Sequence, residues 1–431
     1  MVTTEDRIRF RKNEPPRLLV FGYPLKYARV GGLLWSKRVS DLISKLSTFD
    51  VRNISTERSI HAKLNTGRIV SNIIPCLIKD LYDSLHGLLT LPDIALLDSW
   101  GEANIILWGL LRIFRPTTRI VIIFHHYEAR ILPDHLSEIK SSFGRRVAKW
   151  YNSLIEKLTS DMIRDSDMIL TVSRTSALQL CSLYGVTGSN HMATKKDNAP
   201  VGSGKIRIVG IGVDRLTIPT GVQKDIDFFC IGRIEKFDGI DRIWSAVRKL
   251  RPELNFVMIG RASLSEINRL RLMGITHKGQ VSDKEKIELY SRAKVFLFPS
   301  NREGFGIALA DALQLGMAAV IWRLPVFEEL YSDRMLAKQG MIRLVELGNF
   351  ESFAREALKA LDLYEIRHKR RSESSLLLLS PLTTEGKKAI STTTAISILK
   401  LGEEEKQERR SESQSWEDVA AKVVKVLSEL I

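Results

Sequence analysis

The sequence has few cysteines: Cys76, Cys181 and Cys230 are the only three among 431 residues. They lie far apart and are odd in number, so they build neither a disulfide framework nor the closely spaced ligand pairs of a zinc site. We expect buried, reduced side chains that behave as small hydrophobic groups. This pattern predicts a cytoplasmic location, with peripheral attachment to the inner face of a membrane left open.

Long hydrophobic runs are also missing. Residues 1–17 are polar and charged and lack the apolar stretch of a secretory signal. The longest apolar stretch, from Ala103 to Phe114, is interrupted by Arg112. It falls short of the roughly 20 residues that a membrane-spanning helix needs. We therefore predict a buried helix there and expect no segment that crosses a bilayer.

Acidic residues are in deficit, with 50 Asp and Glu against 65 Lys and Arg, which gives a net charge of +15. Such a charge favours anionic partners, namely nucleotides, phospholipid surfaces or nucleic acid. No basic–aromatic motif or zinc spacing supports nucleic-acid binding, which we do not expect. No G-x-G-x-x-G follows a predicted strand either, which argues against a dinucleotide-dependent oxidoreductase.

The remaining composition is that of a folded protein, with 44% hydrophobic and 27% charged residues, and the length favours two domains. Short β-rich runs alternate with helical patterns. The run RIVIIF at 119–124 is continuously apolar, which is typical of a parallel strand buried on both faces. The alternation predicts an α/β protein with two doubly wound parallel sheets. The predicted strands are 17–22, 93–97, 119–124, 168–172, 227–231, 255–259, 295–298 and 319–322.

A Gly-, Ser- and Asn-rich break at 185–203 separates the two sets of strands. Residues 366–414 contain two RRSES cores around a Thr- and Ser-rich stretch, which is typical of a solvated low-complexity insertion. The final WEDVAAKVVKVLSEL has one apolar helical face. We predict a tail, a first domain, a linker, a second domain, the insertion and a terminal helix, at 1–16, 17–184, 185–222, 223–365, 366–414 and 415–431.

Ligands of parallel α/β sheets bind beside the carboxyl ends of the strands. Arg233 follows the strand at 227–231 after Gly232, in the segment CIGRIEKFDG. A guanidinium there can bind two phosphate oxygens at once. A surface arginine that merely caps a strand end is an equally good interpretation of this position.

The segment PSNREGFGIALADALQLG at 299–316 combines a strand end, a Gly-x-Gly loop and a helix. The amides of Gly304, Phe305 and Gly306, with the helix that begins at Ile307, predict an anion site suited to a diphosphate. Glu303 lies in the loop and Asp311 about one turn into the helix, where both can accept hydrogen bonds from sugar hydroxyls. Helix-dipole compensation for Glu303 and a solvated position for Asp311 are the alternatives.

Two further features follow strands of the first domain. His125 and His126 come directly after the strand at 119–124 and reach a ligand site or fill a structural role. The pair Gly31–Gly32 follows the first strand and predicts a loop that approaches a phosphate closely, unless it is a simple turn.

Polar residues after the strand at 93–97, Asp98, Trp100 and Glu102, are candidates for shaping an acceptor pocket, although Asp98 fits a capping role at least as well. Arg145 and Arg146 precede apolar residues at helical spacing. These predict a membrane-contact helix or, in the favoured interpretation, a core face with solvated arginines. The apolar residues are Val147, Trp150, Tyr151, Leu154 and Leu158.

Five segments in order resemble the large family of retaining GT-B glycosyltransferases often called family 4. They are SDMIRDSDMILTVSRTSALQL, RIVGIGVD, FFCIGRIEKFDGID, EGFGIALADALQLG and SWEDVAAKVVKVL. The resemblance implies the GT-B fold, with an acceptor-side domain at 17–184 and a nucleotide-sugar-binding domain at 223–365. It further implies two Rossmann-like domains facing a cleft and a terminal helix that crosses back to the first.

The resemblance also implies roles for the residues singled out above. Arg233 would neutralise the donor diphosphate, Glu303 would bind donor-sugar hydroxyls and Asp311 would hold the ribose. His125 or His126 would lie near the reacting carbon. The remaining donor contacts would come from Gly31, Gly32, Gly304, Phe305, Gly306 and Ile307. The family usually has a lysine where this chain has Asp238, and Lys236 is the candidate substitute.

The implied activity is a retaining, metal-independent hexosyl transfer from a nucleotide-diphosphate sugar, with no further cofactor. Acceptors that fit are a glycan, a lipid-linked sugar or a small molecule, and an anionic membrane is a further expected partner. The aspartates at 238 and 311 depart from the family pattern. They keep a non-catalytic nucleotide-sugar-binding or scaffold protein as the alternative, and an epimerase of the same fold as a third.

Overall fold

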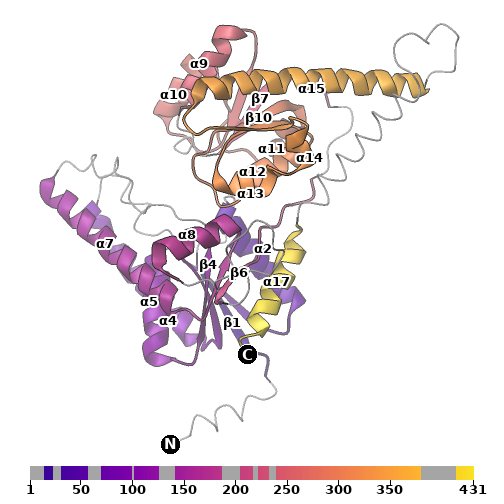
Figure 1. The fold of residues 1–431 in the computed structure, drawn as a ribbon. Coiled ribbons are helices and arrows are strands. Elements are labelled where there is room, and N and C mark those ends of the chain that lie inside the picture. The colour runs from indigo at the N-terminus through magenta and orange to yellow at the C-terminus, as the bar shows by residue number, and fades with distance from the viewer. Residues whose placement is uncertain are drawn as a thin grey trace, which may run out of the picture. The chain divides into compact units, whose positions relative to one another are not determined.

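The computed structural model consists of two compact units (Figure 1). One unit comprises Met1–Gly212 with Trp416–Ile431, and the other comprises Val213–Ser415. The structure describes residues 14–22, 31–56, 69–99, 101–125, 141–186, 204–216, 222–232, 239–379 and 414–431.

The first unit is built on a parallel six-stranded sheet with strand order β2-β1-β3-β4-β5-β6. The central strands β1, β3, β4 and β5 are almost completely buried, which explains their continuously apolar sequences. Polar residues mark the edge strand β2, with sequence DVRNIS. The bounds are β1 Arg17–Gly22, β2 Asp50–Ser55, β3 Ile94–Asp98, β4 Arg119–Phe124, β5 Met168–Thr171 and β6 Ile206–Ile208.

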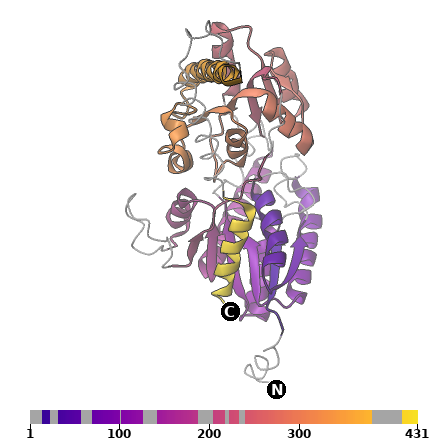
Figure 2. The ribbon, with the colours of Figure 1, turned by 90° about the vertical axis from the view of Figure 1, so that its right-hand side faces the viewer.

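Among the described residues, the helices that accompany this sheet are α2 Gly31–Leu46, α4 Ile69–Leu89, α5 Glu102–Phe114, α7 Ser142–Asp165, α8 Arg174–Tyr184 and α17 Trp416–Ser428. The terminal helix α17 packs against α2 (Figure 2), although some 370 residues separate them in the sequence. Its buried side chains include Trp416, Val419 and Val423. The last helix therefore packs on the first unit, as predicted.

The second unit contains another parallel six-stranded sheet, in the order β12-β11-β10-β7-β8-β9. Its strands are β7 Ile226–Ile231, β8 Phe256–Ile259, β9 Thr276–His277, β10 Ala293–Phe298, β11 Ala318–Trp322 and β12 Ile342–Val345. The helices are α9 Ile240–Leu250, α10 Leu264–Leu272, α11 Asp283–Arg292, α12 Ile307–Gln314, α13 Pro325–Tyr331, α14 Met335–Lys338 and α15 Phe350–Leu379. The predicted pair of doubly wound parallel sheets is confirmed.

The structure differs from the sequence-based prediction in three places. The predicted linker at 185–222 contains strand β6, whose Ile206 pairs with Ile169 of β5, and the units divide after Gly212. Helix α15 continues to Leu379, into the predicted insertion at 366–414, because Arg, Lys, Glu and Leu are good helix formers. Gly31 and Gly32 are the first residues of α2 and not part of a loop.

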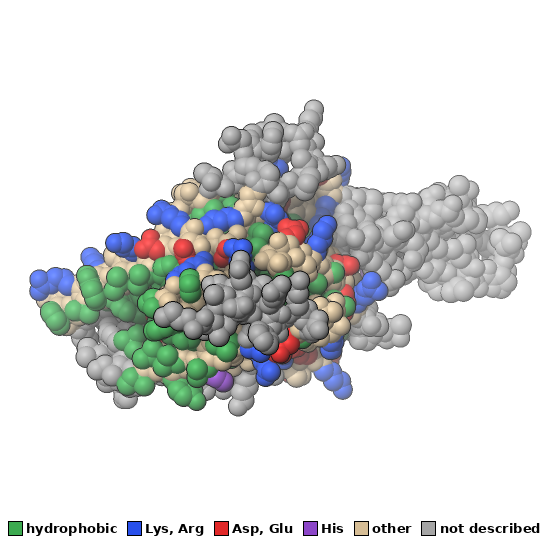
Figure 3. All heavy atoms as spheres, turned by 90° about the horizontal axis from the view of Figure 1, so that it is seen from below, with side chains coloured by type: hydrophobic (Ala, Val, Ile, Leu, Met, Phe, Trp, Pro, Cys, Tyr) green, Lys and Arg blue, Asp and Glu red, His purple; other side chains and the backbone are tan. Residues whose placement is uncertain are grey.

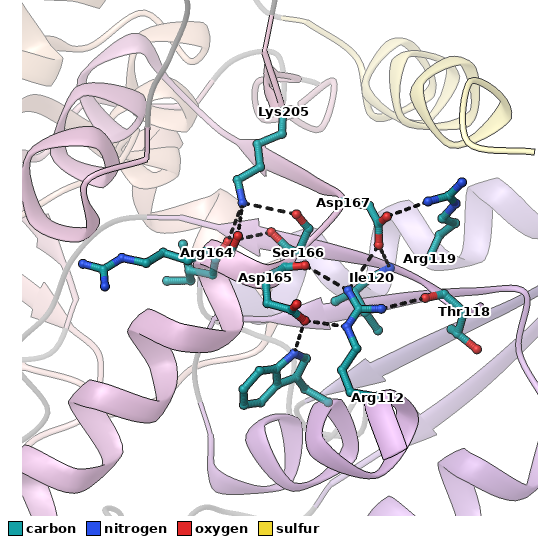
Figure 4. A network of polar contacts seen from close by, with 11 residues as sticks. Arg112, Thr118, Arg119, Ile120, Arg164, Asp165, Ser166, Asp167 and Lys205 are labelled. Carbon is teal, nitrogen blue, oxygen red and sulfur yellow. Dashed lines mark hydrogen bonds and ion pairs between the residues drawn. The ribbon is translucent and has the colours of Figure 1, made fainter. Parts of the chain in front are cut away.

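A polar network joins the amino-terminal ends of the strands in the first unit to the carboxyl end of α7 (Figure 4). Arg112 contacts Asp165 and Asp167, and Lys205 donates to the backbone carbonyls of Ile163 and Ser166. A cation there complements the helix dipole. The network fixes α7 to the sheet at the end opposite the predicted ligand site.

Asp167 is the carboxylate at the centre of this network. Burial by itself raises its pKa, but hydrogen bonds from the Ile120 amide, Arg119 and Arg112 outweigh burial and hold the pKa below its ordinary value. The carboxylate is therefore ionised in the native protein, and its role is structural.

Candidate functional site

The switch point of the second sheet lies between β7 and β10. The chain leaves β7 toward β8 on one side and later returns to β10 on the other, where Phe229 pairs with Phe296. At such a point the loops after the two strands diverge and leave a crevice in which ligands of open α/β sheets bind. The loop that follows Phe298 begins at this point and carries the predicted site residues from Glu303 to Gly306.

The loop after β10 holds the carboxylate of Glu303 in a defined position. Ser300 is fully buried, and its hydroxyl donates to Glu303 Oε1 at 2.8 Å. The indole N–H of Trp322 donates to the carbonyl of Pro299 at 3.1 Å and anchors the start of the same loop. Ser300 was not predicted, because a serine three residues before a glutamate carries no distinctive sequence signal.

The Gly-x-Gly turn leads into α12. Gly306 caps the helix at φ +88°, and a Cβ there would come within 2.9 Å of the Phe327 ring, so the position requires glycine. The amides of Gly304, Phe305 and Gly306 donate no hydrogen bond to any residue that the structure describes. No acidic side chain lies in the first turn, which begins at Ile307. The predicted arrangement of free amides at a helix N-terminus is present, and it suits an anion.

Asp311 is buried and not solvated, so the solvated alternative was wrong. Only 5% of the residue is exposed, and Nζ of Lys286 on α11 lies 3.6 Å from Oδ2. Burial raises the pKa of Asp311 to about 6; Lys286 opposes this shift, and Asp214 adds to it. Lys286 was missed by sequence reasoning because it belongs to no motif, and only the packing of α11 brings it to Asp311.

The raised pKa makes stability depend on pH at this carboxyl. Because the native pKa of about 6 lies above the ordinary 3.8, protonated Asp311 favours folding below pH 3.8. This contribution to the free energy of unfolding amounts to about 3 kcal/mol, and it is lost as pH rises through 6. We expect Asp311→Asn to raise the free energy of unfolding at pH 7.5 and to have little effect near pH 4, as measured by urea unfolding. Glu351→Gln, at a side chain that is 84% exposed, is the control. An equal loss of stability at both pH values would contradict the assignment.

The loop after β7 begins at Gly232, whose amide donates to the carbonyl of Ile259 at 3.1 Å. The next strand, β8, ends at Ile259, and Gly260 follows it. The backbones approach so closely here that a Cβ on Gly260 would lie 1.9 Å from the Gly232 carbonyl oxygen. The predicted phosphate ligands Arg233 and Lys236, together with Asp238, lie outside the described residues.

In the first unit the switch point lies between β1 and β3. A small pocket there is lined by Gly22, Trp35, Ser36 and Asp98, among others. His125, directly after β4, packs edge-on against Trp35 with ring centroids 5.6 Å apart, and its carbonyl accepts from the Ser176 hydroxyl at 2.7 Å. Trp35 was not predicted. The predicted His126 and Trp100 lie outside the described residues.

Other predicted residues of the first unit prove to be structural or exposed. Glu102, 2% exposed, opens α5 and accepts a hydrogen bond from the Tyr151 hydroxyl at 3.1 Å. The favoured core-face interpretation of α7 was wrong for Trp150 and Leu154, which are 65% and 37% exposed. The residues that α7 buries are Ala148, Ile155, Thr159, Met162 and Ile163.

Comparison with solved structures places the whole chain in one fold. It superposes on sucrose-phosphate synthase from Thermosynechococcus elongatus with a TM-score of 0.62 at 12% identity, covering 96% of this chain and 99% of that one. A glycosyltransferase from Rickettsia africae gives a TM-score of 0.57 at 16% identity, covering 97% and 99%. A trehalose-6-phosphate protein from Escherichia coli, bound with UDP-2-fluoro glucose, gives 0.55 at 11% identity, covering 96% and 98%.

Sequence relatives match shorter segments. A serotype-specific mannosyltransferase, WbdA, of Escherichia coli is 40% identical over 53 residues, which are 12% of this chain and 6% of that protein. A phosphatidyl-myo-inositol mannosyltransferase of Propionibacterium freudenreichii is 27% identical over 117 residues, 27% of this chain and 28% of that protein. The matches thus span less than a third of either relative.

The family model of the glycosyl transferases group 1 matches residues 218–375, a range that lies within the second unit and includes both loops at its switch point. The chain therefore has the GT-B fold, and its residues 218–375 are similar to the group 1 glycosyl transferases.

Proposed function

We propose that this protein is a retaining glycosyltransferase that moves a hexosyl group from a nucleotide-diphosphate sugar to an acceptor hydroxyl without a metal ion. The observation that carries the proposal is the strand–loop–helix from β10 to α12. It combines a carboxylate fixed by buried Ser300, amides without acceptors among the described residues and the buried Asp311. These groups are suited to a sugar, a diphosphate and a ribose, in that order along the chain.

Each group has a task that follows from its chemistry. The amides of Gly304 to Gly306 and the N-terminus of α12 bind diphosphate oxygens. Glu303, an acceptor-only carboxylate when ionised, takes hydrogen bonds from donor-sugar hydroxyls. Asp311 accepts from the ribose hydroxyls, and Lys286 beside it favours the ionised form that does so. Arg233 and Lys236 add positive charge to the diphosphate.

The reaction breaks the bond between the anomeric carbon and the diphosphate oxygen and forms a bond from that carbon to the acceptor oxygen. The acceptor proton passes to the departing phosphate, on the same face of the sugar, so that configuration is retained. Negative charge accumulates on the diphosphate. N–H groups that are already in position before the reaction stabilise this charge. His125 or His126 is the group of the first unit that we propose to act near the reacting carbon.

The names of the relatives direct the choice of donor. Two sequence relatives are mannosyltransferases, and one structural neighbour was solved with a UDP-sugar analogue. Mannose and glucose conjugates of UDP, GDP and ADP are therefore the donors to test first.

The test is calorimetric titration of the full chain with UDP, GDP, ADP and these conjugates, followed by a transfer assay with and without EDTA. We expect one nucleotide to bind, Glu303→Ala to weaken only the sugar conjugate, and EDTA to leave transfer unchanged. Glu253→Ala, at a side chain 59% exposed, is the control. The absence of binding at millimolar nucleotide would overturn the proposal.

A non-catalytic nucleotide-sugar-binding protein is the second candidate, and Asp238 favours it. A carboxylate near a diphosphate weakens binding by like-charge repulsion. Binding of a donor with neither transfer nor release of the sugar would support this alternative. Tighter binding by Asp238→Lys would show that the aspartate is a handicap to donor binding.

A further inference from the structure

Helix α4 has its apolar side turned outward. Ile78, Leu81, Tyr82, Leu85 and Leu89 are 63%, 44%, 66%, 43% and 75% exposed, and their spacing places them in one stripe along the helix. The opposite side buries Asp80 and Asp83, at 2% and 5% exposure. A helix on the surface of a water-soluble domain normally has the reverse pattern, so this stripe requires an apolar partner.

The two helices that follow on this side of the sheet extend the apolar surface. Ile113 and Phe114 at the end of α5 are 71% and 63% exposed. Phe143 and Trp150 of α7 are 69% and 65% exposed. Hydrophobic side chains gather into one broad area on the side of the molecule where α4, α5 and α7 lie (Figure 3). We call the outward side chains of these three helices the apolar face.

The first half of α7, which contributes to the apolar face, carries three cations and no acidic residue. On α4, the half-exposed Lys79 forms an ion pair with the buried Asp83, with 2.8 Å between Nζ and Oδ1, so its charge is compensated within the helix. Arg145, Arg146 and Lys149 stand in the first half of α7, where residues 142–155 include no Asp or Glu. Three cations near a helix N-terminus oppose the helix dipole, so the fold of α7 gains nothing from their placement.

We propose that the apolar face docks on an anionic phospholipid bilayer, with α4, α5 and the first half of α7 lying in the plane of the interface. Aromatic and aliphatic side chains next to Lys and Arg are what such an interface binds. Within the described residues, no helix is long and apolar enough to cross a membrane. Docking of the apolar face would bring the first unit to acceptors carried by lipids.

Charge argues against a second copy of this chain as the occupant. A two-fold dimer through the apolar face would be isologous, so the same cations would border it on both subunits. Arg145, Arg146 and Lys149 of the two subunits would then face one another without an acidic residue from the first half of α7 between them. An anionic bilayer supplies the opposite charge.

The test is co-sedimentation of the full chain with vesicles of phosphatidylcholine containing 30% phosphatidylglycerol and with pure phosphatidylcholine vesicles. The wild type should bind the anionic vesicles at least tenfold more tightly. Ile78→Asp with Leu85→Asp should lower this binding at least tenfold. Arg145→Glu with Arg146→Glu and Lys149→Glu should do the same, because one basic residue near an anionic surface is worth about fivefold in binding.

Matched variants elsewhere on the surface serve as controls. Leu264→Asp with Leu272→Asp, at side chains of α10 that are 80% and 90% exposed, should leave binding unchanged. Lys249→Glu with Lys422→Glu and Lys425→Glu reverses three exposed charges outside the apolar face and should lower binding far less. Thermal unfolding of every variant checks that the fold is intact.

Three results would overturn the inference. They are equal binding of the wild type to neutral and anionic vesicles, unchanged binding of the Ile78→Asp, Leu85→Asp variant, and a dimer in sedimentation equilibrium that this variant dissociates. The assay contains no sugar donor, so its outcome is independent of the proposed transfer reaction.

Discussion

Glu303→Gln should reduce kcat/KM for sugar transfer by about 10²–10³-fold, the range observed when a single positioned charge or donor is removed from an active site. The substitution keeps the size of the side chain and leaves Ser300 an oxygen to donate to. It removes the negative charge that accepts from donor-sugar hydroxyls. Initial rates at varied donor concentration, together with calorimetric affinity for the bare nucleotide, measure the effect.

The bare nucleotide separates the sugar contact from the rest of the site. Its affinity should change less than threefold in Glu303→Gln, because the amides of Gly304 to Gly306 and Asp311 are untouched. Glu351→Gln, at a side chain that is 84% exposed, is the matched control and should have wild-type kinetics. A Glu303→Gln enzyme of full activity would remove Glu303 from the donor site.

Gly260→Ala should lower the free energy of unfolding of the second unit by at least about 3 kcal/mol. The backbone there has φ +134°, which side-chain-bearing residues rarely adopt. The new Cβ would also lie 1.9 Å from the carbonyl oxygen of Gly232, and backbone cannot move aside as a flexible side chain does. Because Gly232 directly precedes Arg233, nucleotide affinity should fall together with stability. Urea unfolding and nucleotide titration measure the two effects.

Gly279→Ala measures the effect of the unfavourable dihedral angle alone, without the steric overlap that a Cβ on Gly260 would cause. Gly279 also has positive φ, at +70°, but nothing lies within 4 Å of the position of its Cβ. It should cost only about 1–2 kcal/mol and leave nucleotide affinity as it is. If the two variants lost the same free energy of unfolding, the contact between the new Cβ and the Gly232 carbonyl oxygen would contribute nothing to the destabilisation.

The parallel strands could be predicted because a strand that is buried on both faces has a continuously apolar sequence. RIVIIF at β4 and VFLF within β10 have no other good interpretation. Strands at the sheet edges could not be predicted as well: β2 reads DVRNIS and β9 has only two residues. Helix α4 escaped notice for a different reason, since its outward stripe and buried aspartates invert the pattern by which surface helices are identified.

The candidate site could be predicted as far as it follows the chain. Glu303, the Gly-x-Gly turn and Asp311 belong to one continuous segment, so strand, loop and helix signals sufficed to place them together. Lys286 and Ser300 could not be found in this way. Lys286 reaches Asp311 from another helix, and the bond from Ser300 to Glu303 depends on how the loop folds back. Side-chain partners from separate elements are set by packing, which a single sequence does not encode locally.

The return of α17 to the first unit has a consequence for the order of events during synthesis. The sheet of the first unit emerges from the ribosome before the second unit, but the helix that packs beside α2 is made after the second unit. Val213–Ser415 is a continuous insertion and emerges complete before that helix does. The nascent chain should therefore finish the second unit first, since domains fold as units once their chain is available. Until Trp416 arrives, the side of α2 that α17 covers stays open to chaperones and to neighbouring chains.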